Sequence, residues 1–299
     1  MDHLPVVLGE LGDAPHAREP APAPALSPAA RLSCHADASV GSELVPPVCR
    51  EPSPEILYRD DALCAYAKPA GLLVHRTRLD RWETDFALQR VRDLLGAPVY
   101  PVHRLDKATS GVLLFARSPA VAARLAAAFE AGMVRKRYLA IVRGWPPAEL
   151  LIEHPLARLA DAYEERSASA EPQAARTRLA RIATAELPVS VDRYPTSRYA
   201  LVALEPLSGR RHQLRRHLKH ANHPIIGDTT YGQGRHNRLF RERFLTARLM
   251  LAAVSLALEH PVTGVPLAIH APPAADFARV ALALGWPAAL VAAAGRVEP

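Results

Sequence analysis

The chain has 299 residues, of which 49% are hydrophobic and 22% are charged, as is typical of a soluble globular protein with a sizeable core. Its formal net charge of +7 favours anionic partners. No apolar run approaches the roughly 20 residues that span a bilayer, and three cysteines without metal-type spacing predict no disulfide framework, so we expect a cytoplasmic protein with no membrane partner.

Residues 1–53 form a Pro/Ala-rich extension that we expect to be disordered. The first 54 residues hold 10 of the 28 prolines, and such a segment buries too little apolar surface to offset its ordering entropy. The extension carries three basic and seven acidic side chains, a net charge of −4, which leaves +11 on the remainder. Residues 54–299 are therefore expected to form the folded domain and to bind a polyanion.

The ordered part begins with a predicted hairpin over ILYRDDALCAYAKP, whose turn is expected at residues 59–61. A helix follows at 84–95 with Gly96 as its C-terminal cap, and another starts at Ser118-Pro119 and ends at Gly132. Strands are predicted at 111–116, 136–142, 199–205, 249–258 and 265–270, a polar loop at 158–181, and a basic helix at 209–221. This order indicates a mixed α/β fold.

The motif HRLDKATSG, residues 103–111, places Asp106 between the cations Arg104 and Lys107, directly before a predicted buried strand. Nearby positive charge favours the ionised carboxylate, as a catalytic site would require. The alternative is an Asp that caps a turn, with Thr109 and Ser110 satisfying the loop backbone. The residue types alone leave both interpretations open.

The segment GRRHQLRRHLKHANHPIIGD, residues 209–228, is strongly basic. On a helix, Arg211 and Arg215 share a face with Leu218, whereas Arg216 and Lys219 point elsewhere. Residues 210–219 hold five Arg or Lys and no acid, which fits phosphate contacts or an arginine held over a carboxylate. A solvated charged face is the alternative.

Two further segments carry weaker signals. RKRYLAIVRGW, residues 135–145, interleaves cations with Tyr138, which fits base stacking as well as a place in the core of a strand. KPAGLLVHR, residues 68–76, predicts a tight turn at its Pro and Gly.

Taken in this order, the four segments resemble the RluA-type family of pseudouridine synthases over about residues 55–275. The resemblance rests on HRLD-x-x-TSG as the catalytic loop, KPAG-x-x-VH before it, and K-x-Y-x-A-x-V-x-G, GR-x-HQLR-x-H and HPIIGD after it. Further stretches, such as RYPTSRYALVALEP and HNRLF, resemble members of the family that act on tRNA, at position 65 in the T-arm. Ser208 stands where the family has Thr, and the change keeps the hydroxyl.

The resemblance implies a role for each matching residue. Asp106 would be the nucleophile that detaches the uracil from its ribose, Arg215 would pair with it, and Tyr138 would stack on the target base. Arg104 would fill the space that a flipped-out uridine leaves in the RNA. The other residues expected at the RNA are His103 and Thr109, which would shape the loop, with Lys136, Arg211 and Arg216.

The resemblance also implies the architecture: a single α/β (α+β) catalytic domain at 54–299, with a bent, mostly antiparallel mixed sheet, a central basic cleft and no S4 domain. No cofactor or metal is expected, because an isomerisation has no redox step. The expected partner is RNA, with tRNA favoured, and the expected state is a monomer.

Three alternatives stay open. The same chemistry on ribosomal RNA is the first, and a non-catalytic RNA-binding protein on this scaffold is the second, although Asp106, Tyr138 and Arg215 are all present. The third is a metal-dependent hydrolase, although its four candidate histidines do not share one side of a helix and no zinc motif accompanies them. These histidines are His212, His217, His220 and His223.

Overall fold

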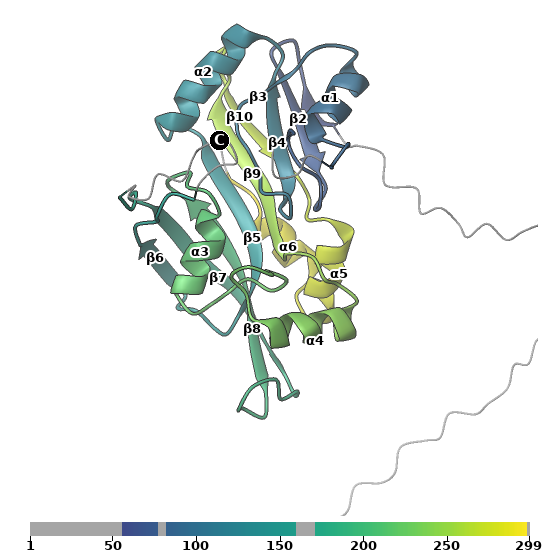
Figure 1. Cartoon of the computed structure of the whole chain (residues 1–299), viewed down its shortest axis with the longest axis vertical. Coiled ribbons are helices and arrows are strands. Elements are labelled where there is room, and N and C mark those ends of the chain that lie inside the picture. Colours follow the sequence, from purple (N-terminus) through teal and green to yellow (C-terminus); the bar gives the residue numbers. More distant parts are fainter. Residues whose placement is uncertain (1–55, 77–81, 160–170, 298–299) are drawn as a thin grey trace, which may run out of the picture. The chain divides into compact units, whose positions relative to one another are not determined.

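A ten-stranded mixed sheet runs through the residues that the structure, a computed structural model, describes: 56–76, 82–159 and 171–297 (Figure 1). These residues belong to one unit of the chain, residues 50–299. The extension at 1–53, predicted to be disordered, lies outside the described residues, as do 160–170 of the predicted polar loop.

The strands are β1 (Ile56–Arg59), β2 (Leu63–Lys68), β3 (Tyr100–Pro101), β4 (Ser110–Ala116), β5 (Arg135–Arg143), β6 (Glu149–Glu153), β7 (Arg176–Leu187), β8 (Ser197–Pro206), β9 (Leu251–Glu259) and β10 (Pro266–His270). The helices are α1 (Ala87–Leu95), α2 (Pro119–Glu130), α3 (Gln213–His220), α4 (Gly234–Phe244), α5 (Ala275–Ala283) and α6 (Ala288–Ala294).

The strand order is β1-β2-β4-β9-β5-β8-β7-β6, with β10 paired to β9 and β3 paired to β4. Only the β4–β9 pair is parallel among the described strands, so the predicted mostly antiparallel mixed sheet is confirmed. The register between β5 and β9 shifts between Arg137 and Tyr138. Such an irregularity increases the local twist and re-aims the side chains next to it.

Strand β4 is buried on both faces, which explains its continuous apolar run. Val112 and Leu114 pack in the cluster that includes α2, whereas Leu113 and Phe115 pack in the cluster that includes α1. Gly111 begins this run with a φ of 118°, and a Cβ added there would lie 1.9 Å from the carbonyl oxygen of Ala253. Only glycine therefore lets β9 approach the end of the HRLDKATSG motif.

Most of the predicted elements are confirmed, with boundaries displaced by a few residues. The first hairpin is present with its turn at residues 60–62, α1 begins three residues later than expected, and Ser118 caps α2 by accepting a hydrogen bond from Val121 N at 3.3 Å. The prediction of a loop through residue 181 is wrong from Arg176 onwards, because Thr177 and Leu179 alternate into the core as part of β7.

The basic helix is also shorter than predicted. It starts at Gln213, because His212 adopts a left-handed backbone conformation with φ of 56° and the Gln213 side chain accepts hydrogen bonds from Ser208 Oγ and Arg210 N. Arg211 therefore precedes the helix and does not share a helical face with Arg215. In Figure 1, α3 lies over β7, and it also contacts β8.

Helices α4, α5 and α6 were not predicted, and they cover the C-terminal part of the main core through Phe240, Phe277 and Val291. No single helix in the described ranges is long and apolar enough to cross a membrane; α5 and α6 reach that length only as a pair bent by 120°.

Candidate active site

All nine residues that the sequence nominated line one cleft of about 760 Å³. The cleft lies where three segments meet: the loop between β3 and β4, the first half of β5, and the β8–α3 connection with the first turn of α3. The structure therefore brings together Asp106, Arg215, Tyr138, Arg104, His103, Thr109, Lys136, Arg211 and Arg216.

Arg215 bridges two carboxylates from different segments. Its Nη1 donates to Asp106 Oδ2 at 3.3 Å, while its Nε and Nη2 donate to Asp228 Oδ2 and Oδ1 at 2.7 and 2.9 Å. The Arg215 and Asp228 side chains are buried, whereas the Asp106 side chain is 23% exposed to the cleft. The two-point contact with Asp228 fixes the plane of the guanidinium and aims its third nitrogen at Asp106.

Asp228 is held firmly enough to act as this anchor. Its Oδ1 also accepts the backbone N–H groups of Thr230 and Tyr231, both at 2.9 Å. Burial alone would raise the pKa of Asp228, but the hydrogen bonds from Arg215 and from these two amides outweigh burial and hold the pKa below its ordinary value. Asp228 is therefore ionised at neutral pH.

His212 and Tyr231 complete the surroundings of the two acids. His212 Nε2 lies 3.8 Å from Asp106 Oδ1, and its Nδ1 is 3.1 Å from the Tyr231 hydroxyl. The Arg215 guanidinium lies over the Tyr231 ring at 5.1 Å. Burial lowers the pKa of His212 more than the nearby Asp106 raises it, so this histidine is neutral at pH 7.

The loop that carries Asp106 is tied down on both sides. Thr109 N donates to Asp106 O at 3.0 Å, and the buried Lys68 donates through Nζ to the carbonyl of Lys107 at 3.1 Å. Lys68 also donates to Leu72 O at 2.7 Å, and Gly71 N donates to Lys107 O at 2.8 Å. The KPAG turn therefore clamps the peptide that follows Asp106.

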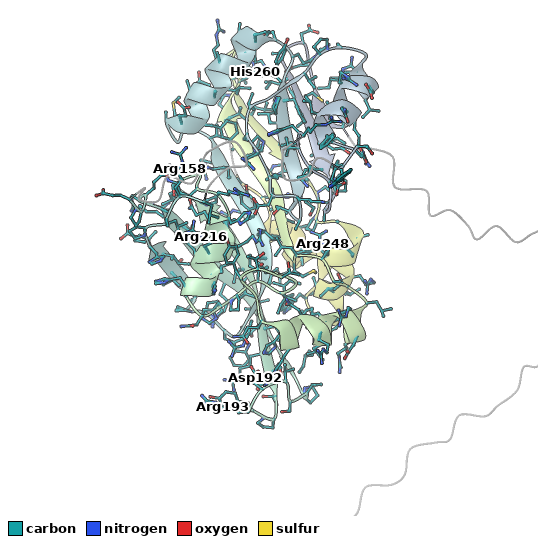
Figure 2. All side chains as sticks on the ribbon, in the orientation of Figure 1. Arg158, Asp192, Arg193, Arg216, Arg248 and His260 are labelled. Atoms are coloured by element: carbon teal, nitrogen blue, oxygen red, sulfur yellow. The ribbon has the colours of Figure 1, made fainter. Side chains whose placement is uncertain are left out.

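A second clamp comes from the segment between α4 and β9. Arg248 Nη2 donates to Ser110 Oγ at 2.8 Å, and its Nη1 pairs with Asp276 of α5 at 3.1 Å. Figure 2 shows Arg248 beside α5, on the side of the sheet away from α3. These contacts fix the peptide between the Asp106 loop and β4.

Tyr138 and Lys136 project from alternate positions of β5 into the cleft. Burial, with the Asp106 charge as a smaller cause, raises the pKa of Tyr138, so the phenol stays protonated. Burial likewise lowers the pKa of Lys136. A neutral ring and a cation that sit side by side suit a base and its phosphate.

His103 lines the cleft, but its ring contacts other residues of the protein. Its ring stacks on Phe129 at 4.9 Å, and its Nε2 accepts the N–H of Leu114 at 2.9 Å. Burial, with Lys136 as a second cause, lowers the pKa of His103 to about 3, so the ring is neutral. This placement fits a residue that shapes the loop.

The rim of the cleft is cationic. Arg104 is exposed, Arg211 is half-buried, and Arg216 donates to the carbonyl of Ala157 at 2.9 Å. Arg158 and Arg210 add two more guanidinium groups to the lining, and Figure 2 shows Arg158 on the same side of the molecule as Arg216 of α3. The predicted basic cleft is therefore present.

The four candidate metal histidines do not converge. His217 Nδ1 contacts Thr177 Oγ1 at 2.9 Å, His223 Nδ1 contacts Arg143 O at 3.0 Å, and the ring of His220 stacks on His154. Among the described residues, no group of three or more His, Cys, Asp or Glu is placed to hold a metal ion.

Sequence reasoning assigned no role to Asp228, Tyr231, Lys68 or Arg248, and it weighed His212 only as a metal ligand. Two of them carried a readable signal. Asp228 directly follows the apolar Pro-Ile-Ile-Gly run, and Lys68 ends an otherwise apolar strand; a charge in such a position requires a buried partner. The partners themselves lie far away in the sequence, which is why the pattern alone did not supply them.

Comparison with known proteins agrees with this geometry. Residues 62–220 match the profile of the family described as RNA pseudouridylate synthase. The protein named tRNA pseudouridine synthase C from Vibrio cholerae is 47% identical over 219 residues, which cover 73% of this chain and 90% of that protein. The proteins of that name from Salmonella typhi and Pasteurella multocida are 49% and 51% identical, over 78% and 70% of this chain and 90% and 87% of theirs.

Solved structures show the same fold. Human RNA pseudouridylate synthase domain containing 4 superposes with a TM-score of 0.58 at 26% identity, over 77% of this chain and 92% of that one. Human RNA pseudouridylate synthase domain containing 1 gives a TM-score of 0.56 at 27% identity, over 73% of this chain and 83% of that one. A single catalytic domain of this fold therefore accounts for the sheet described above.

Proposed function

The chain belongs to the RNA pseudouridylate synthase family, and we propose that it converts one uridine of tRNA, at position 65 in the T-arm, into pseudouridine. The chain is an isomerase that acts on RNA. The name shared by relatives that are 47–51% identical, tRNA pseudouridine synthase C, supports tRNA as the substrate. The excess positive charge of residues 54–299 also fits a polyanion.

The reaction rearranges bonds within one nucleotide. The bond from ribose C1′ to uracil N1 breaks, a bond from C1′ to C5 forms, the C5 proton leaves, and N1 takes up a proton. No electrons are gained or lost, so the chemistry needs a nucleophile, a place for the detached base to turn, and exclusion of competing water.

The observation that carries the assignment is the bridge from Arg215 to Asp106 and Asp228. We assign Asp106 as the nucleophile, because it is the carboxylate of the pair that reaches the cleft. Arg215 orients it through the 3.3 Å contact, and Asp228 orients Arg215. A nucleophile held in position in this way avoids much of the entropic cost of attack.

We assign Tyr138 to stacking on the target base. We assign Arg104 to the gap that the base leaves in the RNA. The reacting atoms of a uridine are shielded in a stacked helix, so the nucleotide must turn out into the cleft, which costs a few kcal/mol. The neutral ring of Tyr138, whose phenol stays protonated, offers a stacking surface in the cleft beside Asp106. The exposed Arg104, two residues before Asp106, is placed to occupy the vacated position in the RNA.

Tritium release from RNA labelled at uracil C5 tests the proposal. We expect the wild-type chain to release tritium from unmodified tRNA, and Asp106→Asn to release none, because an amide cannot attack. Release from ribosomal RNA alone would keep the chemistry and overturn the substrate. RNA binding by the wild type without any release would overturn the enzymatic assignment.

We further propose that the chain acts as a cytoplasmic monomer. One copy supplies every side chain of the Asp106–Arg215–Asp228 bridge and the cationic rim around it. Light scattering of the purified chain with and without tRNA would reveal any larger assembly.

A further inference from the structure

Helix α4 is strongly two-sided. His236, Phe240 and Phe244 recur every four residues and are buried against the core. Arg235, Arg238 and Arg241 lie on the opposite side and are exposed. We call these three residues the α4 arginine face.

The α4 arginine face has little negative charge to balance it. The helix GRHNRLFRERF carries four arginines and one acid, Glu242. Within the described part of the chain, the guanidinium groups of Arg238 and Arg241 have no hydrogen-bond or ion-pair partner. Like charges at this spacing repel one another unless an anion lies across them.

Arg235 is nearest to an acid, but that acid is already engaged. Its Nη1 lies 3.8 Å from Asp192 Oδ1, whereas Asp192 Oδ2 lies 3.0 Å from His236 and 3.5 Å from Arg143. The Arg235 side chain is 77% exposed. Its charge therefore remains available to a ligand in solvent.

The tip of the β7–β8 hairpin extends this surface. Asp192 joins the tip to α4 through His236, and Figure 2 shows Asp192 and Arg193 together at the end of the hairpin. The Arg193 guanidinium lies over the Tyr194 ring at 4.9 Å, and Tyr194 is 56% exposed. An exposed aromatic ring with a stacked arginine is a platform for a nucleobase.

The helix that carries this surface starts close in the chain to the catalytic site, and it has a suitable length. Helix α4 begins three residues after Tyr231, whose ring lies under the Arg215 guanidinium. Successive arginines at i, i+3 and i+6 are about 4.5 Å apart along a helix axis. Long arginine side chains at this spacing can reach successive phosphates of a backbone that runs along the helix.

We propose that the α4 arginine face, with Arg193 and Tyr194 at the hairpin tip, binds the sugar–phosphate backbone of the RNA substrate outside the catalytic cleft. The proposal rests on the proposed function in taking tRNA as that RNA. The cleft would select and convert the uridine, and the α4 arginine face would hold the flanking stem. Rate at saturation and affinity are then carried by different parts of the molecule.

The test is a variant of the full chain with Arg235→Gln, Arg238→Gln and Arg241→Gln, assayed for binding of unmodified tRNA across a salt series. Each phosphate contact contributes about 0.7–0.9 to the slope of log affinity against log salt, so the slope should become shallower by about 2 to 3. Turnover at saturating tRNA should match that of the wild type, and KM should rise.

The matched control removes the same charge elsewhere: Arg59→Gln, Arg92→Gln and Arg124→Gln, three exposed arginines on β1, α1 and α2. Its slope should stay at the wild-type value. Equal slopes for the two triple variants would overturn the proposal. This is also the result expected if α4 binds a protein partner and not RNA. If the triple variant misfolds, Arg238→Gln alone should make the slope shallower by about 0.7–0.9.

The two proposals fail separately. If wild-type chain releases no tritium from tRNA while the α4 variant still shows the shallower slope, the tRNA activity is refuted and the RNA-binding surface stands. If tritium release is normal and the slope is unchanged, the surface is refuted and the activity stands.

Discussion

Replacing Asp228 by Asn tests whether the nucleophile depends on an acid that never reaches the cleft. Asp228 Oδ1 accepts three hydrogen bonds, from Arg215 Nη2, Thr230 N and Tyr231 N, and Oδ2 accepts one from Arg215 Nε. If the asparagine amide keeps its oxygen where Oδ1 accepts three hydrogen bonds, its NH2 group takes the place of Oδ2. The NH2 group then faces Arg215 Nε. Two donors then face each other, and the negative charge that balanced Arg215 is gone.

The size of the effect follows from burial. The Asp228 side chain is 1% exposed and that of Arg215 is 9% exposed, so water cannot replace the lost contact. Breaking a buried, hydrogen-bonded pair of this kind costs about 3–5 kcal/mol of unfolding free energy. A displacement of the guanidinium by 1 Å or so would misplace Asp106 and lower the rate of the chemical step by about 100-fold.

Urea unfolding and single-turnover tritium release measure the two effects separately. Affinity for tRNA should change little, because it rests on many phosphate contacts. Asp93→Asn is the control, since Asp93 pairs with Arg92 on the surface and its loss should cost no more than about 1 kcal/mol. An Asp228→Asn chain as stable and as fast as the control would refute the anchoring role.

The stability difference between wild type and Asp228→Asn should also depend on pH. The pKa of Asp228 in the folded chain lies below its ordinary value of 3.8. The contribution of this carboxylate is therefore complete above that ordinary value and is lost as pH falls through the lower, folded value. Equilibrium unfolding should show a constant difference above about pH 5 that shrinks under stronger acid.

Three other predictions concern the cleft and the extension. Asp106→Ala should abolish tritium release while filter binding shows tRNA affinity within about threefold of wild type, because the phosphate contacts remain; a large loss of affinity would contradict this. Deletion of residues 1–52 should leave turnover and thermal stability unchanged, and a truncated chain that fails to fold would contradict the predicted disorder. Because the pKa values of His103 and His212 are lowered, neither ring gains charge near neutrality, so His212→Gln should bind tRNA with the same pH dependence as the wild type between about pH 6.5 and 8. A pH dependence that differs between His212→Gln and the wild type would show that this ring is protonated in the cleft.

The sequence predicted the central strands because burial leaves a local pattern. Strand β4 is apolar at every position from Val112 to Ala116, and β8 is nearly so, and both lie inside the sheet. The end of α1 was also predictable from a local signal. Gly96 has the left-handed φ of 62° that the C-terminus of a helix requires, and glycine favours this conformation. The pairing order of the strands has no such local trace.

The elements that were missed or misplaced depend on contacts from elsewhere in the chain. Residues 209–212 look helical by composition, yet Gln213 turns its side chain back onto this segment and His212 takes a left-handed conformation. This conformation brings the His212 ring to 3.8 Å from Asp106. Nothing within ten residues of His212 indicates that partner, because Asp106 lies more than a hundred residues earlier.

The balance of charge around Arg215 explains why one guanidinium serves two acids. Its single positive charge is largely matched by Asp228, at 2.7 and 2.9 Å, and the contact to Asp106 is longer, at 3.3 Å. Asp106 is therefore oriented without being fully neutralised. A carboxylate in a tight two-point ion pair has its lone pairs occupied, whereas one held by a single longer contact keeps them available for attack.

The neighbouring groups preserve this balance. His212 is neutral beside Asp106, and Lys68 Nζ donates to three backbone carbonyls, those of Pro69, Leu72 and Lys107. Burial lowers the pKa of Lys68 to about 7, while the nearby Asp106 carboxylate opposes that shift. A second full ion pair to Asp106 would hold the acid more firmly and make it a poorer nucleophile. The strongest ion pair of the site instead joins Arg215 to Asp228, and Asp106 has only the longer contact with Arg215.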